Sequence, residues 1–125
     1  MSKLDGYTDT DKKIITHLMH LFVHAKMERG ELPEDEAVIK AEMPKTFVAS
    51  KMYIDTVNSV MSRYANFDPS DAQRVRAISV SLFQGAIMSN EVTHDMQDQE
   101  VERISKELVR DSVQTVNAVA EYLCG

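Results

Sequence analysis

The sequence contains few residues that cross-link chains or interrupt helices, and each shortage excludes a class of structure. Cys124 is the only cysteine among 125 residues, so no disulfide bond can form within the chain. Only four glycines and three prolines punctuate the sequence. Alternation of apolar and polar residues is not sustained over any stretch, which disfavours a β-sheet. The sequence therefore predicts an all-helical protein without covalent cross-links.

Long apolar segments and an excess of positive charge are also missing. No run of consecutive apolar residues exceeds three, far below the roughly 20 residues that span a bilayer. The first residues lack the apolar core of a signal peptide, so we expect a cytoplasmic protein with no membrane association. The formal net charge of −6 repels phosphate groups and disfavours nucleic acid as a partner.

The remaining composition is that of one globular helical domain spanning residues 1–125. The apolar fraction is 43% and the charged fraction 27%. Tryptophan is absent, so aliphatic side chains and methionine must fill most of the core. Capping residues, prolines and glycines mark the ends of a bundle of about five helices, four long and one a short connector. The expected helices cover residues 8–30, 34–42 (the connector), 44–66, 70–91 and 96–123.

The helix expected at 70–91 is predicted to be the central one. Past Arg76 it carries no charge until Glu91, and apolar residues recur at helical spacing. We expect Ile78, Leu82 and Phe83 to lie in the core. Gly85 inside this helix costs roughly 1 kcal/mol relative to alanine, and a close helix crossing would explain its presence.

Three of the four histidines form a row on the first expected helix. His17, His20 and His24 fall within about 60° of one another at 100° per residue, and Glu28 extends the row. Imidazole is a common ligand of transition metals, so the row is a candidate metal site. One helix does not easily supply a third ligand, and His94 is the only other histidine. The alternative interpretation is that the three side chains border the apolar face or belong to an interface.

Sequence motifs do not assign a catalytic residue or a cofactor. The acidic clusters at 34–36 and 95–100 lie at helix starts, where negative charge is favoured in any helix. No P-loop, His-Glu-x-x-His, Gly-x-Ser-x-Gly or Cys-x-x-Cys motif is present. The helices at 44–66 and 70–91 have the spacing of a helix-turn-helix, with Arg74 and Arg76 near the start of its second helix. A DNA-associated regulator is therefore kept as an alternative.

The last expected helix carries more apolar surface than one packed side requires. Its second half shows the alternating four-three spacing of a coiled-coil seam, and two further apolar residues lie on another side. About 28 residues would make it roughly 42 Å long, more than the roughly 30 Å span of a compact domain. One end should therefore project and pair with a second copy, unless helices one and three cover it. The candidate interface residues are Val109, Val113, Val116, Val119, Ala120, Tyr122 and Leu123.

These patterns predict a small acidic helical binding or regulatory protein that acts through protein–protein contacts, as a homodimer and without enzymatic activity. The identity of any other protein partner is not encoded in a motif. A metal- or ligand-binding protein that uses the histidine row is the first alternative.

Overall fold

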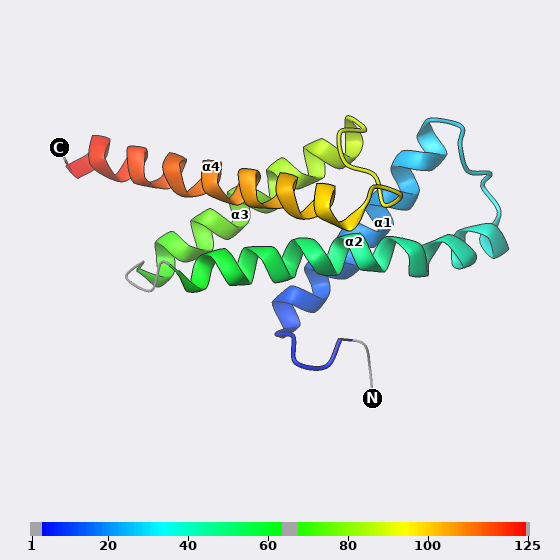
Figure 1. Ribbon diagram of the computed structural model, residues 1–125, viewed down its shortest axis with the longest axis horizontal. Coiled ribbons are helices and arrows are strands. Elements are labelled where there is room, and N and C mark those ends of the chain that lie inside the picture. Colours follow the sequence, from blue (N-terminus) through cyan, green and yellow to red (C-terminus); the bar gives the residue numbers. More distant parts are fainter. Residues whose placement is uncertain (1–3, 64–67, 125) are drawn as a thin grey trace.

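The computed structural model describes residues 4–63 and 68–124, and all regular secondary structure within these ranges is α-helical (Figure 1). Four helices make up the described chain: α1 (Asp9–Glu28), α2 (Glu36–Ser62), α3 (Pro69–Met88) and α4 (Asp98–Cys124). Helix α2 packs against α1 and α4, and α3 packs against α4 and α1. Within the described residues, no helix is both long enough and apolar enough to cross a membrane.

The expected connector and the helix after it form one continuous helix, which corrects the expected number of helices. Asp35 caps α2 by accepting a hydrogen bond from the Ala37 backbone N–H at 2.9 Å, and the helix continues through Pro44. A proline removes one backbone hydrogen bond and typically costs about 3 kcal/mol inside a helix. Here Pro44 is exposed, whereas Thr46 two residues on is buried. Burial along α2 outweighs the local penalty. The helix was expected to end near Asn66, which lies outside the described residues.

The ends of the other helices follow the expected capping chemistry. The Thr8 hydroxyl accepts a hydrogen bond from the Asp11 backbone N–H at 3.1 Å, and Asp68 caps α3 in the same way through Ser70 at 2.9 Å. Gly30 follows α1 with a φ of 74°, the left-handed conformation that glycine adopts without strain. These caps fix the residues at which the helices end and the connections between them begin.

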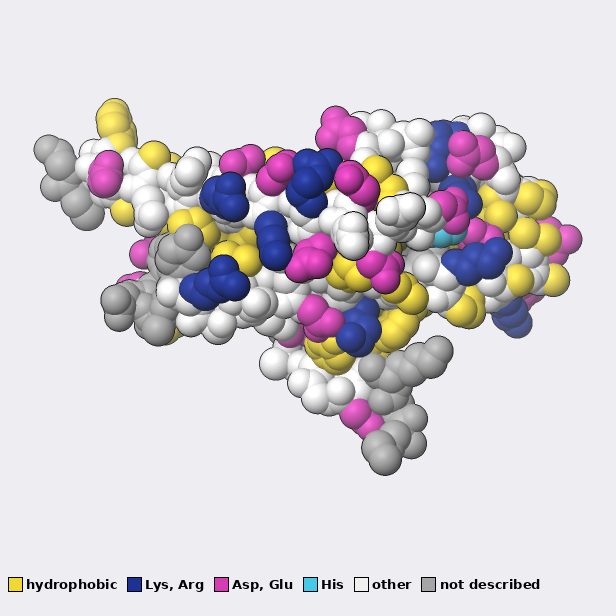
Figure 2. Space-filling model, viewed as in Figure 1, with side chains coloured by type: hydrophobic (Ala, Val, Ile, Leu, Met, Phe, Trp, Pro, Cys, Tyr) yellow, Lys and Arg dark blue, Asp and Glu magenta, His cyan; other side chains and the backbone are white. Residues whose placement is uncertain are grey.

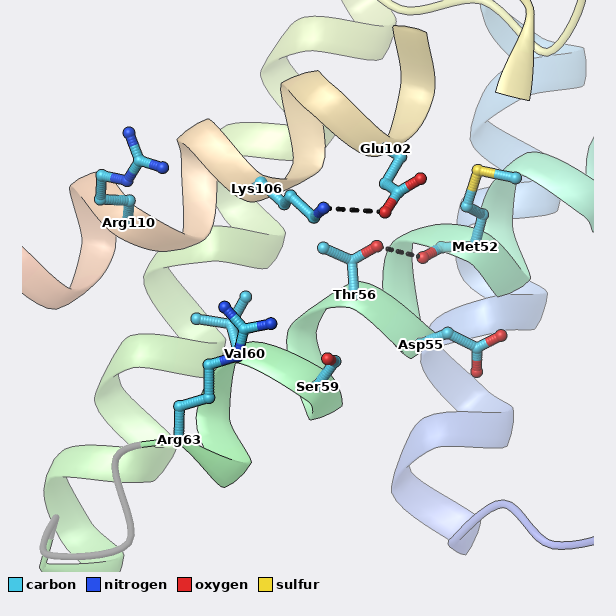
Figure 3. A pocket seen from close by; sticks show the side chains of 9 residues that line it. All are labelled: Met52, Asp55, Thr56, Ser59, Val60, Arg63, Glu102, Lys106 and Arg110. Carbon is cyan, nitrogen blue, oxygen red and sulfur yellow. Dashed lines mark hydrogen bonds and ion pairs between the residues drawn. The ribbon is translucent and has the colours of Figure 1, made fainter. Parts of the chain in front are cut away.

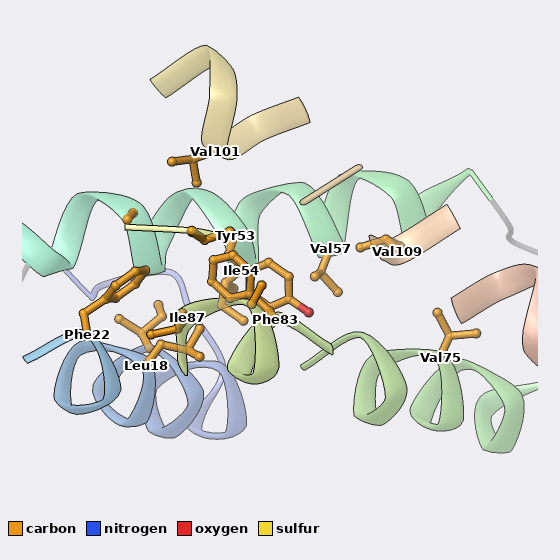
Figure 4. Packing of buried hydrophobic residues seen from close by; sticks show 14 of the residues in the cluster. Leu18, Phe22, Tyr53, Ile54, Val57, Val75, Phe83, Ile87, Val101 and Val109 are labelled. Carbon is orange, nitrogen blue, oxygen red and sulfur yellow. The ribbon is translucent and has the colours of Figure 1, made fainter. Parts of the chain in front are cut away.

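The core is centred on three stacked or edge-on aromatic rings from three helices (Figure 4). The Tyr53 and Phe83 rings stack with centroids 4.1 Å apart, and Phe22 meets Phe83 edge-on at 6.2 Å. Aliphatic side chains from all four helices surround this group. The Tyr53 hydroxyl donates a 2.8 Å hydrogen bond to Ser79, so this buried phenol is satisfied.

Helix α3 is rotated relative to the sequence-based expectation. Phe83 is fully buried as predicted, and Ile78 is partly buried, but Leu82 is 41% exposed. The prediction of Leu82 as a core residue is therefore wrong. Apart from the two chain neighbours of Gly85 and the backbone of its own helix, no atom lies within 4 Å of the position that a Cβ on Gly85 would occupy, so the expected close helix crossing is absent there. Helix α3 has one buried side and one open side.

A buried polar network joins three helices near the start of α1. Asp11 is buried and accepts hydrogen bonds from Asn58 on α2 and Arg76 on α3. Arg76 also donates to the Asn58 side-chain oxygen at 2.7 Å. Both Asp11 carboxylate oxygens and both polar side-chain atoms of Asn58 find a partner, as buried polar groups require. Of the two arginines placed on the hypothetical recognition helix, Arg76 is thus used inside the fold.

Candidate functional site

The outer end of α4 extends past the other helices and carries exposed apolar side chains (Figures 1 and 2). All residues from 117 to 123 are exposed. Val119 is 48% exposed, Tyr122 86% and Leu123 71%. Large apolar side chains exposed together commonly mark an interaction surface.

The candidate interface residues on α4 divide into two groups. Val109, Val113 and Val116 are buried within the chain's own core. The rest of the set is exposed: Val119, Ala120, Tyr122 and Leu123. The seam therefore packs internally over its first half and continues without cover over its second half. The helices that α4 packs against are α2 and α3, whereas the alternative to a dimer expected the helices at 8–30 and 44–66 to cover it.

A shallow groove between α3 and α4 adjoins this exposed segment. It has a volume of about 210 Å³ and is lined by Arg74, Ala77, Ile78, Thr115, Val116 and Val119. Leu82 lies one helical turn beyond Ile78 on the same side of α3. The groove and the end of α4 together form one largely apolar surface, which we call the α3–α4 face.

A second groove lies between α2 and α4 and has a more polar lining (Figure 3). Its volume is about 640 Å³. Lys106 forms a 2.9 Å ion pair with Glu102, and the Thr56 hydroxyl donates to the Met52 carbonyl oxygen. Its charged residues carry both signs, and each of them is exposed to solvent. The groove therefore offers an open polar surface rather than an enclosed site.

The histidine row lies on the solvent side of α1. His17, His20 and His24 are exposed and border a shallow apolar depression of about 380 Å³ that also includes Met27 and Ile39. His24 forms a 3.0 Å ion-pair contact with Glu28. The structure brings no acidic or histidine side chain from another helix into this depression among the residues described. A metal site on the row remains a prediction.

Potential metal ligands converge elsewhere, around the fourth histidine. Within the described ranges one group of three His, Cys, Asp or Glu side chains has ligand atoms within 4.8 Å of one another: Glu42, His94 and Asp95. His94 Nε2 lies 2.9 Å from Glu42 Oε1, and Nδ1 lies 3.0 Å from Asp95 Oδ1. Lys26 Nζ lies 2.9 Å from Asp95 Oδ2 and 3.3 Å from Glu42 Oε1. We call these four residues the His94 cluster.

Three segments position the His94 cluster. Lys26 comes from the last turn of α1, Glu42 from the second turn of α2, and His94 and Asp95 from the α3–α4 connection. Helix α3 ends at Met88, and Asn90 in the following turn has a φ of 66°, a conformation that asparagine tolerates better than most residues. This reversal brings Val92 into the core, and His94 follows it inward.

Charge and burial act against each other in the cluster. Burial and the nearby Lys26 lower the pKa of His94, and they outweigh the two carboxylates, which raise it. Burial alone would raise the pKa of Glu42, but the hydrogen bond and charge of Lys26 bring it below the usual value. Burial opposes the charge of Lys26, yet Asp95 and Glu42 raise its pKa overall. The hydrogen bond from Lys26 lowers the pKa of Asp95 as well, so both carboxylates are ionised and Lys26 is protonated at neutral pH.

The imidazole of His94 is almost completely enclosed. Its side chain is 1% exposed, and its ring packs edge-on against Phe22 with centroids 6.1 Å apart. Neither ring nitrogen makes a hydrogen bond of normal direction, although both lie close to carboxylate oxygens. Both ring nitrogens therefore lie near a carboxylate group, but the angles are unsuitable for a hydrogen bond to either one.

Sequence reasoning considered His94 only as a possible partner of the histidine row. The cluster joins residues far apart in the chain, and no local spacing relates Lys26, Glu42 and His94. Glu91 and His94 do stand at Glu-x-x-His spacing, but that spacing aligns two ligands only on a helix. The segment from 91 to 95 is not helical, and Glu91 is exposed.

Comparison of the chain with protein-family models, curated proteins and solved structures found no match.

Proposed function

We propose that this chain is a small acidic protein-interaction module that works as a homodimer, paired through the α3–α4 face and without catalytic activity. The observation that carries the proposal is the uncovered end of α4, where Val119, Tyr122 and Leu123 are exposed on a segment that projects beyond the bundle (Figure 1). A helical segment without tertiary contacts is marginal in water, so a binding partner would stabilise it.

A second copy fits this face because each chain supplies both halves of the contact. The end of α4 offers large apolar side chains, and the adjoining groove offers a recess lined by Ala77 and Ile78. Two-fold pairing would insert Tyr122 or Leu123 of each copy into the groove of the other, which is how an isologous interface is built.

The required contact area also involves α3. A stable interface buries at least about 1,000 Å² in total, more than two seven-residue helix ends supply by themselves. The open side of α3, with Ile78 and the 41% exposed Leu82, extends the apolar area beside α4. The proposed dimer therefore uses both helices.

Sedimentation equilibrium of the unmodified chain and of Val119→Glu tests the proposal. About half of the Val119 side chain remains to be buried, which corresponds to about 0.7–1.5 kcal/mol per copy. Two copies contribute about 1.5–3 kcal/mol, so the dimer should dissociate at least roughly tenfold more readily. The matched control is Val48→Glu on α2, because Val48 is 51% exposed and lies outside the α3–α4 face. Equal effects of the two substitutions, or a mass of 14.1 kDa for the unmodified chain at micromolar concentration, would refute the pairing.

The regulatory role, the cytoplasmic location and the absence of nucleic-acid partners belong to this proposal as expectations from the sequence. Charge on the α3–α4 face is sparse compared with that of a phosphate-binding surface, which supports a protein partner. Measurement of DNA affinity at several salt concentrations would test the DNA-associated alternative, because affinity that depends on phosphate contacts falls steeply as salt rises.

A further inference from the structure

We infer that Glu42, His94 and Asp95 form a binding site for one divalent transition-metal ion, separate from the histidine row and from the α3–α4 face. The three side chains place an imidazole nitrogen and two carboxylate groups around one point. Imidazole with carboxylates is a donor set used for zinc, manganese and iron. The site would join α2 to the α3–α4 connection.

The distances in the cluster match those between two ligands of one ion. Zinc binds nitrogen and oxygen at about 2.0–2.2 Å, so ligands at tetrahedral angles stand about 3.3 Å apart. One ligand atom from each of Glu42, His94 and Asp95 lies within 4.8 Å of the others, and His94 Nε2 is 2.9 Å from Glu42 Oε1. Asp95 Oδ1 lies 3.0 Å from the other ring nitrogen, Nδ1, and an imidazole binds an ion through one nitrogen, so one of the two carboxylates has to turn toward the nitrogen that holds the ion. Small side-chain movements would therefore admit an ion without a change in the backbone.

The buried histidine is an independent indication of a ligand. The His94 side chain is 1% exposed and neither nitrogen has a hydrogen-bond partner of normal direction, although buried polar atoms are almost always satisfied. A neutral imidazole nitrogen donates its lone pair to a metal ion, which would satisfy it.

Lys26 is the resident cation with which a metal ion would compete. Its ammonium group bridges Asp95 and Glu42, where it balances the two negative charges. The Lys26 side chain is 17% exposed and that of Asp95 is 62% exposed, so the ammonium group reaches solvent on this side. An incoming ion can displace the ammonium group along this route, and Lys45, 3.6 Å from Glu42 Oε2, stays at the outer edge.

Isothermal titration of the 125-residue chain with Zn²⁺ tests the site, with Co²⁺ absorption as a spectroscopic second readout. We expect one equivalent of each metal per chain at this site. Asp95→Asn should weaken the affinity more than about tenfold, because it removes a ligand charge from an exposed position with little effect on packing. His94→Gln should do the same and remove the Co²⁺ bands. Lys26→Met should tighten binding, because it removes the competing charge.

The matched control replaces His17, His20 and His24 together with glutamine, which removes the surface row and leaves the cluster intact. Binding of one equivalent should persist in this variant. Loss of all binding in the control, retained affinity in Asp95→Asn, or no stoichiometric binding to the unmodified chain would each overturn the site. Circular dichroism of each variant establishes that it is folded, and Asp95→Asn alone decides the question if His94→Gln or Lys26→Met does not fold.

Discussion

The orientation of α3 can be tested by a pair of neighbouring substitutions, Phe83→Ala and Leu82→Ala. Phe83 is fully buried and contacts the rings of Tyr53 and Phe22, whereas Leu82 is 41% exposed. The two residues are adjacent on one helix, so helix propensity and local sequence context are nearly the same for both. A difference between the two variants therefore reports which side of α3 faces the core.

The expected losses follow from burial. Removal of a buried phenylalanine side chain typically costs about 3–5 kcal/mol, because a cavity is left behind. Leu82→Ala removes three carbon atoms worth about 0.8 kcal/mol each when buried, and about three-fifths of that area is covered. We therefore expect a loss of about 1.4 kcal/mol for Leu82→Ala, with no cavity because solvent fills the space.

Urea denaturation followed by circular dichroism measures both free energies of unfolding. The substitutions should be made in the Val119→Glu background, so that self-association through the face that includes Leu82 does not add to the stability. A Leu82→Ala loss equal to or greater than that of Phe83→Ala would mean that α3 presents its other side to the core. The packing described around Tyr53 would then be wrong.

Two further predictions concern the same region. In the Val119→Glu background, Gly85→Ala should stabilise the protein by about 0.4–1 kcal/mol, because the position is helical, exposed and open to an added methyl group. Thermal melting should show a rise of about 2–5 °C, and a fall would reveal a close contact at this position. Tyr53→Phe should cost about 0.5–1.5 kcal/mol through loss of the 2.8 Å hydrogen bond to Ser79. In a Ser79→Ala background, Tyr53→Phe should cost much less, because the hydrogen bond is already lost. Equal costs of Tyr53→Phe in the two backgrounds would contradict the bond.

Local sequence signals located most helix ends but misplaced one boundary. Gly30 and Asp68 mark real ends because caps and left-handed residues act within a few positions. Pro44 also predicted a helix boundary from local sequence, and that prediction was wrong. Its cost is local, whereas the gain from continuing α2 comes from contacts with α1 and α4 that lie far away in the sequence.

A buried serine explains why the face of α3 was misjudged. The buried side of the helix includes Val75, Ser79 and Phe83, at intervals of four residues. A search for apolar periodicity passes over Ser79 and favours Ile78 and Leu82 instead. The hydroxyl of Ser79 is tolerated in the core because it accepts from Tyr53 and donates to the Arg76 carbonyl oxygen. A partner 26 positions away gives no signal to a search based on local spacing.

The candidate sites show the same division between local and distant information. The apolar end of α4 could be predicted because its residues are neighbours on one helix, although the burial of Val109, Val113 and Val116 depends on the other helices. The His94 cluster could not be predicted, since it forms only when α1, α2 and the α3–α4 connection come together.

Hydrogen–deuterium exchange at the end of α4 tests the central claim most directly, because it reports whether a second copy covers that segment. In a monomer, the backbone amides of residues 117–123 should exchange rapidly, since the segment has exposed side chains on all sides. The proposed dimer predicts protection of these amides at micromolar concentration, and a loss of protection on dilution or in Val119→Glu. Rapid exchange of this segment at every concentration would contradict the account.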